Sequence, residues 1–117
     1  MALGMLALAE CSRDAGYRQW VDQYCSTTLA TYDEFHRQYD VLQERTGFNY
    51  RLFRGAMLDD TAAPALPFVE QLLQGAFPEG RPVVDSVAAF VARGQSRLAD
   101  GTLCRPEPEP GTVWADD

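Results

Sequence analysis

Lysine and isoleucine are absent from this 117-residue chain, and Asn49 is its single asparagine. The codons for these three residues are AT-rich, so a GC-rich bacterial source accounts for their scarcity. All ten basic residues are therefore arginines, against 17 acidic residues and a net charge of −7. Proteins that bind nucleic acid normally have a basic excess, so the charge argues against nucleic acid as a partner.

Long hydrophobic runs are also missing. No apolar run approaches the roughly 18 residues that a membrane span needs. The apolar start, residues 1–11, contains no basic residue and carries Glu10 where a lipoprotein signal needs a small residue. We therefore expect an amphipathic or buried first helix, a cytoplasmic location and no membrane partner.

The signatures of metal sites and common enzymes are missing too. The three cysteines have no CxxC spacing, and their odd number makes a poor disulfide framework. Pairing of Cys11 with Cys25 remains open. The glycines form no phosphate-binding loop and no GxSxG motif. We expect no metal, no cofactor and no enzymatic activity.

The single histidine, His36, is the one residue that suggests catalysis. Asp33 and Asp40 lie three residues before it and four after it, within reach along a helix. A carboxylate that orients an imidazole is part of many general-base sites, but a surface ion pair is the simpler interpretation. The segment 33–36 also has the carboxylate-x-x-His step of di-iron bundles, which need a second histidine.

The central third of the chain predicts a long helix over residues 14–45. No proline occurs there, Ser12 or Asp14 can cap its start, and Gly47 can stop it. At 1.5 Å per residue it would be about 48 Å long, so it either protrudes or breaks near residues 26–28. Aromatic residues recur on one face at helical spacing and form an aromatic stripe that belongs either to the core or to an interface. The stripe comprises Tyr17, Trp20, Tyr24, Tyr32, Phe35 and Tyr39.

The opposite face of this helix is rich in carboxylates, which we call the acidic row. Its carboxylates are those of Asp22, Asp33, Asp40 and Glu44, and we count His36 and Arg37, which lie among them, as members of the row too. Such a row can be an ordinary solvated face, or it can steer a basic partner toward the helix.

The rest of the chain predicts shorter elements. We expect a weak helix over 48–58 and a turn over 59–64. A further helix starts at Pro67, and a last helix runs from Pro82 to residues 99–101. A strand over 82–91 is a minor alternative. The fold class is all-α: a small bundle of four to five helices over 1–101. Residues 102–117 alternate proline with acid and predict a flexible, irregular tail.

Three functions fit these features. The first is a small acidic helical protein that binds and neutralises another protein, such as a basic toxin or effector, in the manner of an immunity protein, an antitoxin or a phage-type inhibitor. The second is an adaptor or secretion-type chaperone that works as a homodimer. The third is a helical bundle that binds or converts a small molecule through His36. Size, charge and the lack of a catalytic set favour the first.

Overall fold

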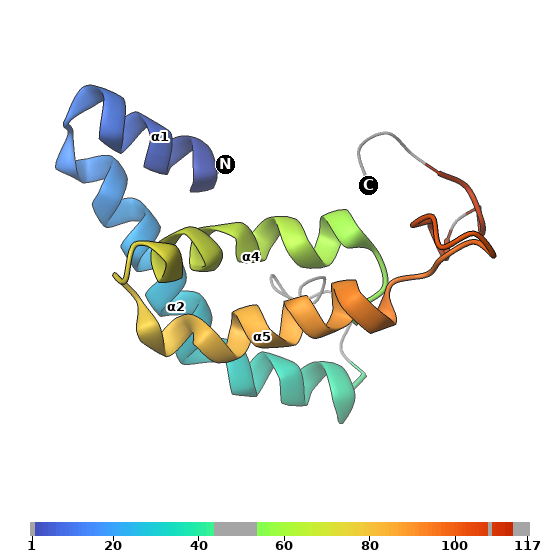
Figure 1. Ribbon diagram of the computed structural model, residues 1–117. Coiled ribbons are helices and arrows are strands. Elements are labelled where there is room, and N and C mark those ends of the chain that lie inside the picture. The colour runs from blue at the N-terminus through green and yellow to red at the C-terminus, as the bar shows by residue number, and fades with distance from the viewer. Residues whose placement is uncertain (1, 44–53, 108, 114–117) are drawn as a thin grey trace.

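The computed structural model describes residues 2–43, 54–107 and 109–113, and these form a small all-α fold (Figure 1). Its α-helices are α1 (Ala2–Ser12), α2 (Ala15–Asp40), α4 (Leu58–Leu73) and α5 (Arg81–Ala89). A 3₁₀ turn (Pro78–Gly80) precedes α5, and a π-helical turn (Phe90–Gly94) follows it. The described residues contain no strand, so the all-α prediction is confirmed and the strand alternative over 82–91 is wrong.

Helix α2 is one continuous rod, so the break considered near residues 26–28 does not occur. Asp14 caps its start by accepting a hydrogen bond from the Gly16 amide at 2.8 Å. Ser26 donates to the carbonyl oxygen of Asp22, four residues earlier, and so does not cap a new helix. The helix ends at Asp40 rather than Arg45, and Gln43 has a φ of 56°. The predicted stop at Gly47 lies outside the described residues.

Helix α4 corrects two predictions. Residues 59–64 form its first turns rather than a separate turn, and Pro67 lies well inside it rather than at its start. Acidic residues at 59 and 60 favour a helix start, because they lie beside amide groups that lack helical acceptors. Burial of Ala65, Phe68 and Gln71 offsets the backbone hydrogen bonds that the prolines remove. Of the predicted helix over 48–58, residues 48–53 lie outside the described part and 55–57 are not helical.

Helix α5 starts beside Pro82, as predicted, but the helical stretch ends at Gly94 rather than at residues 99–101. The last turn widens into a π-helix, in which the Gln95 amide donates to the Phe90 carbonyl at 2.9 Å. A Cβ at Gly94 would lie 2.7 Å from the Phe90 ring. A side chain at this position would therefore displace the Phe90 ring.

The core lies where α1, α2, α4 and α5 meet. Helices α4 and α5 run antiparallel to each other, and α1 packs on the first half of α2 (Figure 1). Phe68 is fully buried, with its ring edge toward Tyr24 at 6.3 Å and tilted toward Phe77 at 6.0 Å. The buried cluster comprises Leu6, Val21, Cys25, Phe68 and Val83.

The C-terminal segment folds back on the helices through polar contacts. Gln95 is buried and donates from Nε2 to the carbonyl of the buried Cys104 at 3.0 Å. Arg105 pairs with Asp59 of α4 at 3.5 Å, and Glu107 pairs with Arg54. The segment 102–107 therefore contacts the helical body, whereas the flexibility expected of 102–117 stays a prediction. None of the described helices combines the length and the hydropathy that a membrane span requires.

Candidate functional site

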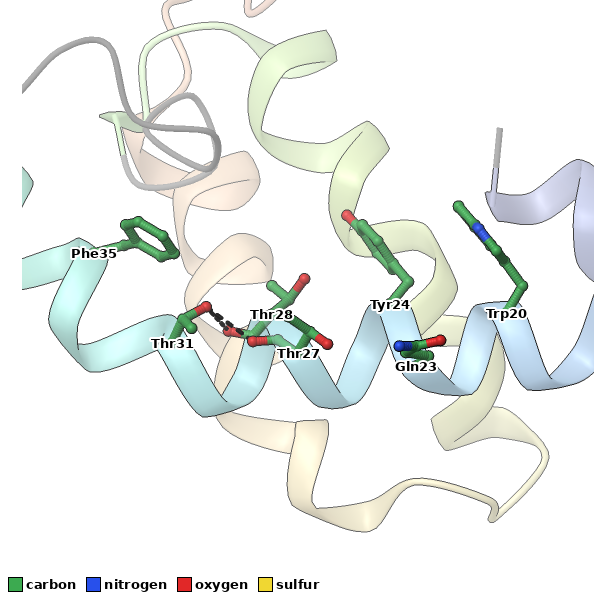
Figure 2. Close-up of a pocket in the computed structure, with 7 residues that line it drawn as sticks. All are labelled: Trp20, Gln23, Tyr24, Thr27, Thr28, Thr31 and Phe35. Atoms are coloured by element: carbon green, nitrogen blue, oxygen red, sulfur yellow. Dashed lines mark hydrogen bonds between the residues drawn. The ribbon is translucent and has the colours of Figure 1, made fainter.

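One face of α2 carries a groove of about 350 Å³, which we call the α2 groove (Figure 2). Its lining residues within the described part of the chain come from this helix, at intervals of one, three and four, so that they share one face. They are Trp20, Gln23, Tyr24, Thr27, Thr28, Thr31 and Phe35. None of them carries a charge, and the groove therefore suits apolar groups.

Trp20 and Tyr24 form one end of the groove. Their rings stack with centroids 5.9 Å apart and planes 7° apart. The Tyr24 hydroxyl donates to the Pro64 carbonyl at 3.0 Å, which fixes that ring against α4. Burial, together with the adjacent Cys25, raises the pKa of Tyr24. Trp20 remains 39% exposed, so its indole is accessible to a ligand while it stacks on the Tyr24 ring, which is held in place.

Threonines form the floor between the two aromatic ends. Thr28 is buried, and Thr31 donates to the carbonyls of Thr27 and Thr28 at 2.9 and 3.3 Å, as Figure 2 shows. This hydroxyl is thus already satisfied by the helix itself. The half-buried Phe35 lies at the other end. A ligand in the groove would meet ring faces and short side chains.

The residues of the aromatic stripe predicted from the sequence differ in how far they are exposed. Trp20 is exposed, while Tyr17, Tyr24, Tyr32, Phe35 and Tyr39 are half-buried. The fully buried positions of α2 are instead Val21, Cys25 and Thr28. Tyr24 and Tyr32 pack against the core, while Trp20, Tyr24 and Phe35 line the α2 groove. Gln23, Thr27 and Thr31 were not among the predicted site residues, although helical spacing from Trp20 places them on its face.

The acidic row lies on the other side of α2, where Asp22, Asp33 and Asp40 are exposed. Much of its charge is paired within the chain. Asp22 lies 3.4 Å from Arg18 and accepts a hydrogen bond from Gln71 Nε2 at 2.5 Å, and Asp40 lies 3.4 Å from His36 Nε2.

A neighbouring pair on the same helix joins Arg37 to Glu34. Arg37 donates to both carboxylate oxygens, at 2.9 and 2.8 Å, and lowers the pKa of Glu34 to about 2. Glu44, the remaining predicted member of the acidic row, lies outside the described residues. Four of the described members of the row, Asp22, His36, Arg37 and Asp40, therefore have partners within the chain.

The cysteines are free thiols, which settles the pairing left open for Cys11 and Cys25. Cys11 is exposed, whereas Cys25 and Cys104 are buried. Burial, and to a smaller extent Asp22, raises the pKa of Cys25 to about 11, so its thiol is protonated at neutral pH. Among the described residues no three His, Cys, Asp or Glu side chains gather as metal ligands would.

His36 lies on the exposed side of α2, where its ring stacks on Tyr32 with centroids 6.1 Å apart. It is not among the residues that line the α2 groove. The groove and the histidine are thus separate features of the helix. No protein-family model matches the chain, and neither a curated protein nor a solved structure is significantly similar to it.

Proposed function

We propose that this chain binds and inhibits another protein, and that the partner docks on α2 by placing apolar side chains in the α2 groove. The observation that carries the proposal is the uncharged groove itself, with an accessible indole stacked on a ring that α4 holds in place. Tryptophan and tyrosine are enriched among the residues that dominate binding energy at protein interfaces. A rigid aromatic anchor also loses little conformational entropy when a partner binds.

The partner's chemistry follows from charge. The chain has a net charge of −7, and Asp33 and Asp40 expose carboxylates on the same helix. A basic protein would be attracted to the negatively charged chain over a distance of about 10 Å at moderate salt, while the apolar contact in the groove, on the other side of α2 from these carboxylates, would hold it. We therefore propose a basic partner that presents apolar side chains. This chain would inhibit the partner by covering the surface that it binds.

The test is a matched pair of charge variants on α2. Thr27 is exposed and lines the groove, whereas Gln19 is exposed and lies outside it. Thr27→Glu places a charge where the partner's apolar side chains would sit, and should weaken binding by roughly 10- to 100-fold. Gln19→Glu adds the same charge to the same helix and should bind as the wild type does.

The measurement starts with affinity capture of partners from a lysate of the source cell, with wild-type and both variant chains as bait. Support comes from a basic protein that wild-type and Gln19→Glu chains retain and Thr27→Glu loses, with the affinity then measured on the purified pair. Equal retention by all three chains would overturn the role of the groove. Far-UV circular dichroism checks that each variant keeps its helix content.

A further inference from the structure

Helix α1 is apolar around its whole circumference, with Glu10 as its only charged residue. A helix of this kind is normally covered on every side. Within the described part of the chain α1 packs on α2 and α4 through one face. Leu6 is buried there, and Met5 and Ala9 are half-buried.

The opposite face of α1 is exposed, and we call it the outer face of α1. Leu3 and Leu8 are 38% and 46% exposed on it. Helical spacing brings these leucines together with three exposed small residues. The outer face comprises Leu3, Gly4, Ala7, Leu8 and Cys11. A Cβ placed on Gly4 would meet no atom of the described residues within 4 Å, so these residues leave the space in front of Gly4 open.

We propose that the outer face of α1 binds the outer face of a second copy of this chain, with the two helices antiparallel about a two-fold axis at Ala7. The face is complementary to itself in this arrangement. The bulky Leu3 of one copy lies beside Cys11 of the second copy, and the small Ala7 residues meet at the axis. Small residues at the crossing point let two helices approach closely. Each contact forms twice, as a two-fold interface requires.

Charge complementarity favours the antiparallel orientation. Glu10 lies near the C-terminal end of its own helix, where the helix dipole disfavours a negative charge. In an antiparallel pair it lies beside the first turn of the second copy's α1, whose amide groups have no helical acceptors. A parallel pair would instead bring the two Glu10 side chains together.

A membrane surface is a poorer occupant of this face. Helices that lie on membranes carry lysine and arginine on their polar side, which attract anionic lipid. Helix α1 has no basic residue, and the chain as a whole has a net charge of −7. This inference concerns a different helix from the α2 groove and does not depend on the proposed function.

The first test is the molar mass of the purified full chain by sedimentation velocity from about 1 to 100 μM, the range in which weak homodimers dissociate. The wild type should reach twice the 13.0 kDa of one chain. Ala7→Glu places two like charges at the axis and should leave a monomer with unchanged far-UV circular dichroism. Gln19→Glu, on α2, should dimerise as the wild type does. A wild type that stays monomeric at the highest concentration overturns the proposal, as does dimerisation of Ala7→Glu.

Cross-linking tests the orientation. In a Cys11→Ser background, Ala7→Cys should give a disulfide-linked dimer under mild oxidation, because the two sulfurs meet at the axis. Gln19→Cys in the same background should not. Rapid oxidation of wild-type Cys11 to a covalent dimer would indicate parallel helices and overturn the arrangement. Flotation of a monomeric wild type with lipid vesicles, half of them anionic, would identify a membrane as the occupant and overturn it as well.

Discussion

Cys25 shows at the scale of one residue how burial controls chemistry. Its side chain is completely buried in α2, with the carboxylate of Asp22 nearby on the same helix, and both raise the pKa of its thiol. The odd number of cysteines predicted a poor disulfide framework, and Cys25 and Cys104 are free and buried. Cys11 is free as well, but α1 turns this thiol toward solvent.

The raised pKa of Cys25 predicts a specific loss of stability at high pH. The thiol ionises near pH 9 in the unfolded chain and near pH 11 in the folded one. Unfolding therefore releases a proton between these values, so the free energy of unfolding is unaffected below about pH 9 and falls as the pH rises toward 11. Two pKa units correspond to at most about 3 kcal/mol.

The measurement is urea unfolding of the wild type and Cys25→Ala at intervals from pH 8 to 11. Cys25→Ala should lower stability at pH 8, because it leaves a small void, but should lose less than the wild type as the pH rises. Burial, the larger cause of the raised pKa of Tyr24, acts in both chains and cancels in the difference, whereas the smaller part due to Cys25 is lost in Cys25→Ala and belongs to the difference. If the free energies of unfolding of the two chains change equally with pH, the environment of Cys25 does not raise the pKa of its thiol.

At the scale of elements, Gln71 joins α4 to α2. Its side chain is 1% exposed, accepts a hydrogen bond from Arg18 Nη2 at 2.6 Å and donates one to Asp22 Oδ1 at 2.5 Å. Arg18 also donates to the exposed Gln74 on the next turn. The amide is the group that fits here, because it accepts from a cation and donates to a carboxylate at the same time.

Gln71→Glu should therefore destabilise the fold in a pH-dependent way. The new carboxylate keeps its contact with Arg18 but faces Asp22, and we expect a loss of about 1–3 kcal/mol at pH 7. The like charge raises the pKa of the new side chain in the folded state. The free energy of unfolding of Gln71→Glu should thus approach that of the wild type below about pH 4, the ordinary pKa range of Glu. It should fall below the wild-type value as the pH rises through the higher pKa of this side chain in the folded state.

Gln74→Glu is the matched control for this substitution. It adds the same charge beside the same arginine, but on an exposed side chain. Chemical unfolding at pH 4, 5.5 and 7 should show little change in its stability relative to the wild type. If Gln71→Glu behaves as this control does, the hydrogen bond between Gln71 and Asp22 does not hold α4 on α2.

The elements differ in how far the sequence predicted them. Asp14 and Pro82 are strong local start signals, and α2 and α5 begin beside them. Helix α4 was mispredicted because Pro64 and Pro67 favour a turn and a helix start locally, while the burial that keeps them in a helix depends on distant residues. The π-helical turn after Ala89 has no local sign. In this turn Gly94 leaves room for the Phe90 ring, which a Cβ would crowd.

The candidate site was predictable to a similar extent. Helical spacing placed Trp20, Tyr24 and Phe35 together on one face, and all three line the α2 groove. Spacing alone does not say which part of a stripe other helices cover, since that depends on where α1 and α4 cross α2. For the same reason the sequence did not show that Asp22, unlike Asp33, is held by a residue of α4.

The whole molecule is extended for its size. Its dimensions are 46 × 33 × 22 Å and its radius of gyration is 15.4 Å, against about 13 Å for a compact domain of this length. Helix α2 alone spans about 39 Å at 1.5 Å per residue. An extended shape buries little apolar surface per residue, and among the described residues few large side chains are completely buried. We therefore expect the proposed association through α1 to add to the stability of the fold.

The melting temperature of the wild type should therefore depend on protein concentration. When a folded dimer melts to two unfolded chains, each tenfold increase in concentration stabilises it by about 1.4 kcal/mol, and the unfolding entropy of two chains of 117 residues converts this to a rise of about 3 °C. Ala7→Glu, which cannot pair through the outer face of α1, should melt at one temperature whatever its concentration. Circular dichroism melts of both chains at about 2, 20 and 200 μM measure the difference. The comparison separates association through α1 from ordinary aggregation, because aggregation lowers the apparent melting temperature as concentration rises and would affect both chains.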